Sequence, residues 1–207
     1  MHHLMHRHLM HGSASGDRYT STAIALHWLI ALLLLGQFVF GLMLGDIPRG
    51  TPERAIYVNV HKSTGLLIGL LIVLRIVWRL THTPPPLPGT MPGWQQRASS
   101  YGHAALYLCM LMLPVSGYVA SNFSKYGVKF FNVVRMPPWG PDDKVLYGFF
   151  NQMHQVAAFL LAVFVGLHVL AVVKHMLVDH DGLLLRMWPR RTARASPRPR
   201  SDLPLEP

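Results

Sequence analysis

The chain has 207 residues, of which 51% are hydrophobic and only 14% are charged. An average soluble domain has about 25% charged residues, and the long uncharged runs of this chain are a requirement of a bilayer rather than of a soluble core. The net charge is +10. The basic residues lie beside the apolar runs and in the C-terminal region. That distribution is typical of membrane topology signals and argues against nucleic-acid binding.

The N-terminal region is unusual. Residues 1–17 contain a cluster of histidines, which we interpret as a disordered leader, with a metal-binding tract as the alternative. No cleavable signal peptide is expected, because the first apolar run is long enough to cross the bilayer. The lone cysteine, Cys109, excludes a disulfide within the chain, and we expect it to be a packing residue.

The first two apolar runs predict membrane helices at residues 22–44 and 60–80. The first run has no charge and contains His27 and Gln37. At about 1.5 Å per residue it crosses a hydrocarbon core of roughly 30 Å. The second run ends with Arg75 and Arg79, whose long side chains reach a membrane face. A proline-rich loop follows it.

Two further helices are predicted at residues 102–121 and 149–177. The third contains Pro114, which a membrane helix tolerates where neighbouring groups satisfy the freed backbone. Between them, residues 121–148 are rich in aromatic side chains, and we expect an interfacial loop with a short helix lying on the membrane. Residues 190–207 are basic and proline-rich, which predicts a disordered tail.

The predicted fold is therefore an all-α, integral membrane four-helix bundle formed by residues 18–189. Four spans place both termini on one side of the membrane. The larger share of the 19 lysines and arginines lies on that side. Because positive residues accumulate in the cytoplasm, both termini are expected to be cytoplasmic.

Histidines inside the predicted spans indicate function, since ionisable residues are costly in hydrocarbon. Measured from the helix midpoints, His27 and His168 both lie about 7–10 Å toward the inside. His61 and His154 both lie about 13 Å toward the outside. His154 and His168 are separated by close to four helical turns, so they share one face of the fourth helix. Two pairs at two depths are predicted.

Such pairs fit haem better than zinc. A structural zinc site requires four protein ligands, whereas a haem iron needs only two axial ligands, which facing helices can provide. Secondary candidates are His103, Arg75 and Arg79, which lie near the inner face. His103 fits interfacial packing or a hydrogen bond to a propionate or a quinone, as does His175, and the arginines fit propionates or topology signals. His82 and His180 are expected to have no role.

Several segments together resemble the bacterial cytochrome b561 family. They lie at residues 25–29 (ALHWL), 60–65 (VHKSTG), 113–118 (LPVSGY), 166–168 (GLH) and 184–189 (LLRMWP). The resemblance covers residues 18 to 189 with order and spacing intact. The leader and the basic tail are departures that the family does not explain.

This resemblance implies a di-haem b-type cytochrome of the bacterial inner membrane. His27 and His168 would ligate the inner haem, and His61 and His154 the outer haem, in agreement with the depth argument. The family implies electron transfer between a donor on the periplasmic side, with superoxide as one candidate and a redox protein as another, and the quinone pool. A homodimer is also compatible with the sequence.

Two other functions remain open from the sequence. The protein can be a cytochrome b membrane anchor within a larger redox complex, such as a hydrogenase or a dehydrogenase. It can also be a metal-ion carrier, although the spans offer few polar residues besides the histidines, namely Gln37, Ser116 and Asn151. The basic residues expected at the outer face, Lys125, Lys129, Arg135 and Lys144, would either steer an anionic donor or only solvate a loop.

Overall fold

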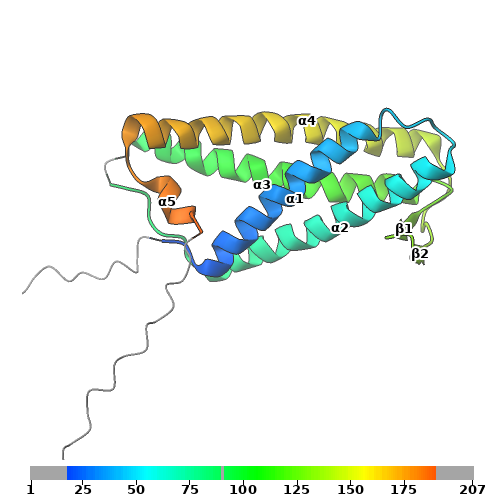
Figure 1. Ribbon diagram of the computed structural model, residues 1–207, viewed down its shortest axis with the longest axis horizontal. Helices are drawn as coiled ribbons and strands as arrows, with labels where there is room; N and C mark the ends of the chain where they lie inside the picture. Colours follow the sequence, from blue (N-terminus) through cyan, green and yellow to red (C-terminus); the bar gives the residue numbers. More distant parts are fainter. Residues whose placement is uncertain (1–17, 90, 190–207) are drawn as a thin grey trace, which may run out of the picture.

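A computed structural model describes residues 18–89 and 91–189 and contains four long helices in an antiparallel bundle (Figure 1). They are α1 (Ser21–Met43), α2 (Pro52–Thr81), α3 (Gly93–Asn122) and α4 (Lys144–Lys174). All four are long and apolar enough to cross a membrane. The predicted helical membrane bundle is confirmed. The predicted leader and tail, residues 1–17 and 190–207, lie outside the described residues.

The outer surface of the bundle is apolar, as a lipid-facing surface must be. Leu32 and Leu35 of α1 are 67% and 65% exposed, and Leu170 of α4 is 65% exposed. An aqueous surface seldom carries so many exposed large apolar side chains. The buried core between α1 and α2 is small and consists of Ile30, Ile68 and Ile72.

Three helices begin earlier than the hydropathy pattern predicts. At α2 and α4 the reason is local capping, because a capped first turn is stabilised without being apolar. Helix α3 begins after Pro92 without a side-chain cap. The Thr51 hydroxyl accepts a hydrogen bond from the Arg54 amide at the start of α2, and Pro52 occupies the first turn. The Asp143 carboxylate accepts bonds from the Val145 and Leu146 amides at the start of α4. Such turns extend beyond the hydrocarbon layer.

The connection between α3 and α4 is a small β-hairpin, so the expected short helix is wrong. Its antiparallel strands are β1 (Val128–Phe130) and β2 (Val134–Met136). Phe131 and Asn132 adopt positive φ angles of 43° and 60° at the turn. The Phe131 amide donates to the Ser63 hydroxyl at 2.7 Å, which fixes the hairpin on the N-terminal half of α2. These long-range contacts have no signature in the local sequence.

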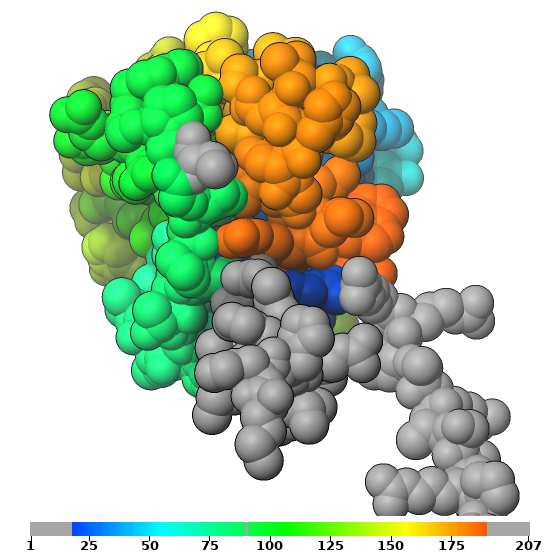
Figure 2. All heavy atoms as spheres, turned by 90° about the vertical axis from the view of Figure 1, so that its left-hand side faces the viewer, coloured from blue at the N-terminus to red at the C-terminus, as the bar shows by residue number. Residues whose placement is uncertain are grey.

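The opposite end of the bundle carries both ends of the described chain (Figure 1). After α4 come a π-helical turn, η1 (His175–Asp179), and a short helix, α5 (Leu183–Met187). Figure 2 looks onto this end, where α5 and the end of α4, in orange, lie beside the start of α3, in green. The Trp28 indole donates to the Met187 carbonyl at 2.8 Å. Arg18 donates to the Trp188 carbonyl at 2.7 Å. Cytoplasmic placement of this end stays a prediction from charge.

Sequential helices pack as neighbours, α1 on α2, α2 on α3, and α3 most extensively on α4. The closest approach of α2 to α3 occurs where Gly69 faces the ring of Pro114. A Cβ atom at Gly69 would lie 2.9 Å from the Pro114 Cβ. Because Gly69 has no side chain, α2 leaves room for the Pro114 ring within the span of α3.

Replacing Gly69 by alanine is therefore expected to destabilise the bundle by about 1–3 kcal/mol through overpacking. The matched control is Gly36→Ala, because a Cβ at Gly36 has no atom within 4 Å. Thermal unfolding of the purified protein in detergent, followed by circular dichroism, measures both. Equal midpoints for the two variants would contradict the proposed close contact.

Candidate functional site

The structure brings the four predicted histidines together in two pairs. The imidazole centroids of His27 on α1 and His168 on α4 are 6.5 Å apart, with an interplanar angle of 71°. Those of His61 on α2 and His154 on α4 are 6.2 Å apart, with an angle of 75°. The pairs lie in opposite halves of the bundle, and α4 contributes to both.

Helix packing explains why facing imidazoles can be accommodated at these places. Helix α4 packs along α3, and among the described residues it makes far less backbone contact with α1 or α2. The histidine pairs span the side of the bundle where α4 faces those two helices. The paired side chains thus meet where the helices are not in close mutual contact.

The ring of His154 is held from behind by α3. Its Nδ1–H donates to the Leu113 carbonyl at 2.8 Å. A Cβ atom at Gly117 would lie 3.1 Å from Nδ1 and 3.2 Å from Cε1 of this ring, so glycine leaves room for the imidazole. Because Nδ1 carries the proton in this arrangement, Nε2 keeps its lone pair and is the nitrogen available to a metal.

His61 is positioned through its backbone and through a glycine. The Gln37 amide nitrogen donates to the His61 carbonyl at 2.6 Å, which ties α1 to α2 at this level. A Cβ at Gly41 would lie 3.2 Å from the His61 Cε1. The buried Nδ1 of His61 has no hydrogen-bond partner among the described residues. Such a nitrogen is costly in an apolar environment unless a further group engages the ring.

A third imidazole, that of His103 on α3, joins the inner pair. Its ring centroid is 5.5 Å from that of His168. Its Nδ1–H donates to the Ser99 carbonyl at 2.7 Å. The sequence predicted only that His103 lies near the inner face. The close approach to His168 depends on the rotation of α3 against α4, which spacing within α3 does not reveal.

The two predicted arginines lie beside the inner layer and contact one aromatic ring. Arg75 donates to the Ala23 carbonyl at 2.7 Å and to the Tyr107 hydroxyl at 3.1 Å. The Arg79 guanidinium lies 5.8 Å from the centre of the Tyr107 ring. These contacts connect α2 with α1 and α3. His82, for which no role was expected, stacks on Trp78 at 3.8 Å.

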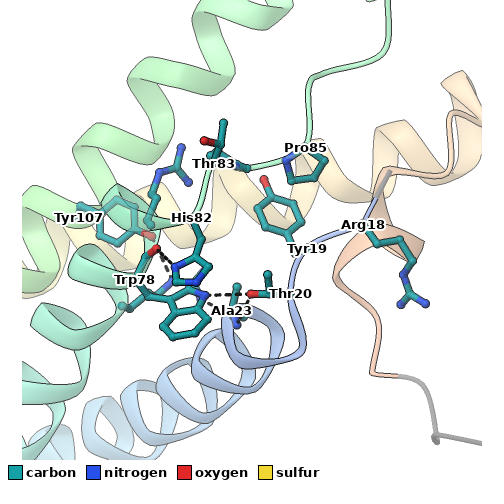
Figure 3. A pocket seen from close by; sticks show the side chains of 12 residues that line it. Arg18, Tyr19, Thr20, Ala23, Trp78, His82, Thr83, Pro85 and Tyr107 are labelled. Atoms are coloured by element: carbon teal, nitrogen blue, oxygen red, sulfur yellow. Dashed lines mark hydrogen bonds between the residues drawn. The ribbon is translucent and has the colours of Figure 1, made fainter. Parts of the chain in front are cut away.

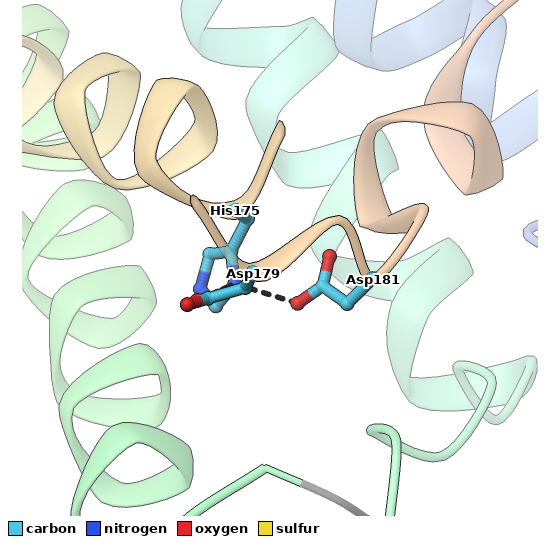
Figure 4. Close-up of side chains that lie close together, drawn as sticks. All are labelled: His175, Asp179 and Asp181. Carbon is cyan, nitrogen blue, oxygen red and sulfur yellow. Dashed lines mark hydrogen bonds and ion pairs between the residues drawn. The ribbon is translucent and has the colours of Figure 1, made fainter. Parts of the chain in front are cut away.

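A separate cluster of His175, Asp179 and Asp181 follows α4 (Figure 4). The His175 Nδ1 lies 2.6 Å from an Asp181 oxygen and 3.0 Å from an Asp179 oxygen. The Lys174 ammonium binds Asp179 at 2.6 Å, and Asp181 also accepts the Leu183 amide. The carboxylates thus already have protein partners, and the cluster fixes the turn that leads to α5.

Comparison with known proteins places this chain in a family. The family described as prokaryotic cytochrome b561 matches residues 18–190. The chain belongs to the prokaryotic cytochrome b561 family. With the four apolar helices, this membership makes the protein a multi-pass protein of the inner membrane and implies haem b as its cofactor.

Individual relatives agree with the family assignment. Cytochrome b561 homolog 2 of Escherichia coli K12 is 30% identical over 172 residues, which cover 83% of this chain and 91% of the relative. Cytochrome b561 homolog 1 of the same strain is 26% identical and covers 84% and 99%. A probable superoxide oxidase CybB of Yersinia pestis is 26% identical and covers 84% and 97%. The similarity thus extends over nearly the whole length of each relative.

The paired imidazoles have the chemistry and spacing that a b-type haem needs. A metal–imidazole bond is about 2.0 Å and the ring centroid lies about 1.1 Å behind the nitrogen, so two imidazoles on opposite sides of one metal would have centroids about 6.2 Å apart. The observed separations of 6.5 and 6.2 Å agree with this value. The His103–His168 separation of 5.5 Å is shorter. The residues present therefore fit the group.

Replacing Gly117 by alanine is expected to displace the His154 ring by a few tenths of an ångström, because the new methyl group would be too close to it. We expect a shifted or weakened haem absorbance from one layer and an unchanged signal from the other. The matched control is Gly166→Ala on α4, where a Cβ has no atom within 4 Å. A low-temperature visible spectrum of each variant measures the effect, and identical spectra would contradict the packing argument.

Proposed function

We propose that this protein is a di-haem b-type cytochrome that carries electrons across the inner membrane between a donor at the hairpin end and the quinone pool. The observation that carries the proposal is the presence of two imidazole pairs, separated by 6.5 and 6.2 Å, in opposite halves of one bundle. A single packing histidine needs no such partner at a matching depth.

In this proposal His27 and His168 hold the inner haem, and His61 and His154 hold the outer haem. Haem b, when bound, supplies reversible one-electron chemistry at each layer. The two histidines of α4 are about 21 Å apart along the helix axis. One rigid helix therefore fixes the relative position of both layers, while α1 and α2 each supply one further ligand.

The protein's own contacts prepare the outer pair for this role. The Leu113 carbonyl keeps the proton of His154 on Nδ1, and Gln37 holds the His61 backbone. If two histidines held each haem, no position would be left for a substrate to bind the iron. Donor and acceptor would therefore exchange electrons at the periphery of each layer, which the protein controls through its helix ends and loops.

We propose superoxide as the donor, on the basis of one relative and of surface charge. The Yersinia pestis relative is a probable superoxide oxidase. Lys129 and Arg135 are paired across the hairpin and are both exposed, whereas Lys125 lies 3.9 Å from Asp142. A positive surface raises the encounter rate of a small anion. The quinone pool is the matching acceptor because it is dissolved in the same bilayer.

Alanine at any one of His27, His61, His154 or His168 is expected to lower the haem content from about two per chain to about one, because each haem loses an axial ligand. The pyridine haemochrome assay of the purified protein gives the count, and a reduced-minus-oxidised spectrum identifies the layer lost. His82→Ala is the control and should keep both haems.

The same assay separates His27 from His103 as the partner of His168. His103→Ala is expected to retain about two haems, because the His27–His168 distance fits a shared iron better. Loss of one haem from His103→Ala with full retention in His27→Ala would overturn the assignment. A well-folded parent without haem, expressed with haem available, would contradict the proposed function as a whole.

The double variant Lys129→Gln/Arg135→Gln is expected to slow superoxide-dependent haem reduction roughly two- to tenfold at low salt and to flatten its salt dependence. Stopped-flow spectroscopy with a superoxide source measures the rate. Arg97→Gln, which removes one positive charge at the opposite end of the bundle, is the control. Unchanged kinetics in the double variant would exclude steering by the hairpin.

A further inference from the structure

A small cavity lies where α1 begins and α2 ends, at the end of the bundle opposite the hairpin (Figure 3). Its volume is about 50 Å³. Its lining includes Arg18, Thr20, Arg75, Trp78, Arg79 and Tyr107. The cavity is distinct from the four paired histidines, none of which lines it.

The cavity concentrates positive charge without a matching negative charge. Three arginines line it, and none of its lining residues is acidic. Among residues 18–89 and 91–189, the ion pairs include none of these arginines. Neighbouring like charges repel each other, most strongly where water is partly excluded. A cavity of this composition is therefore expected to attract an anion.

The arginines are held in place by neutral acceptors. Arg18 donates to the Trp188 carbonyl, and Arg75 donates to the Ala23 carbonyl and the Tyr107 hydroxyl. Arg79 lies over the Tyr107 ring. These contacts fix the guanidinium groups but leave their charge uncompensated. Little side-chain freedom would then be lost when an oxyanion binds.

The cavity lies at the level expected for lipid headgroups. Thr20 caps α1 and His82 caps α2, so the cavity is at the ends of both spans rather than within them. Trp78 donates to the Thr20 hydroxyl at 2.9 Å, and tryptophan and tyrosine favour the membrane–water interface. Val77 and Leu80, close by on α2, are 51% and 80% exposed. They offer an apolar surface to an acyl chain.

The size of the cavity fits a phosphate group. About 10–15 Å³ of such volume holds one water molecule. A cavity of about 50 Å³ therefore admits a group larger than one water molecule. Arginine forms paired hydrogen bonds with phosphate oxygens, which favours this group over a neutral one.

We propose that this cavity binds the phosphate of an anionic phospholipid from the leaflet at this end of the bundle. The phosphate lies beside Arg75 and Arg79, and the acyl chains lie along the exposed apolar side of α2. The bound lipid neutralises the arginines and connects the start of α1 to the end of α2. This binding is independent of electron transfer and does not rest on the proposed donor or acceptor.

Native mass spectrometry of the full-length, haem-loaded protein in detergent tests this proposal. Phosphatidylglycerol and phosphatidylcholine are titrated separately into the delipidated protein. We expect one phosphatidylglycerol to bind in preference to phosphatidylcholine. Arg75→Gln and Arg79→Gln should each weaken that binding roughly tenfold, the loss expected for one charge-assisted hydrogen bond. Arg97→Gln, which removes a positive charge outside the cavity, should bind like the parent.

Each contrary outcome overturns the proposal in a different way. Equal weakening in all three variants would mean that net charge, not the cavity, attracts the lipid. Displacement by millimolar inorganic phosphate without a preference for phosphatidylglycerol would indicate a free anion site. Loss of haem from Arg79→Gln, with lipid binding unchanged, would assign the arginines to a carboxylate of the cofactor instead. Haem is counted on the same samples, so these outcomes are separable.

Discussion

The requirement that polar groups find partners inside hydrocarbon organises this bundle. Each unsatisfied polar group in a membrane interior is costly. Buried Ser63 and Ser116 satisfy this requirement by donating to carbonyls one turn earlier, at 2.6 Å in each case. Gln37 spans two helices for the same reason. The His154 and His103 rings each donate to a carbonyl of α3, whereas the buried Nδ1 of His61 has no partner among the described residues. This constraint links the helix register, the small residues beside the rings and the two imidazole layers.

Most of the architecture follows from the sequence because each membrane-spanning segment must be a long apolar run. Uninterrupted apolar runs predict the four spans, and the structure contains four helices of that kind. The spacing of His154 and His168 by almost four turns places them on one face. Histidines at equal depth on α1 and α2 are then candidate partners in an antiparallel bundle. The observed proximity of both pairs agrees with that reasoning, whereas their role as haem ligands remains a proposal.

The remaining features depend on contacts between segments that are distant in the chain. The hairpin forms where Asn59 and Ser63 of α2 accept hydrogen bonds from Lys129 and Phe131, and aromatic composition alone suggested an interfacial helix instead. His103 approaches His168 because of the rotation of α3, which hydropathy does not determine. The early starts of α2 and α4 depend on the caps Thr51 and Asp143. In each case the sequence gives the residue type but not the partner.

The contacts of the C-terminal segment have a consequence for biogenesis. Trp28 and Arg18, at the start of the chain's first span, bond to the carbonyls of Met187 and Trp188. Translation therefore makes the beginning of α1 long before its binding partners exist. The first span can enter the bilayer early. Its hydrogen bonds to Met187 and Trp188 can form only after the ribosome has produced the residues that follow α4. His154 and His168 both lie on α4, so both imidazole pairs are completed only after this helix has been made.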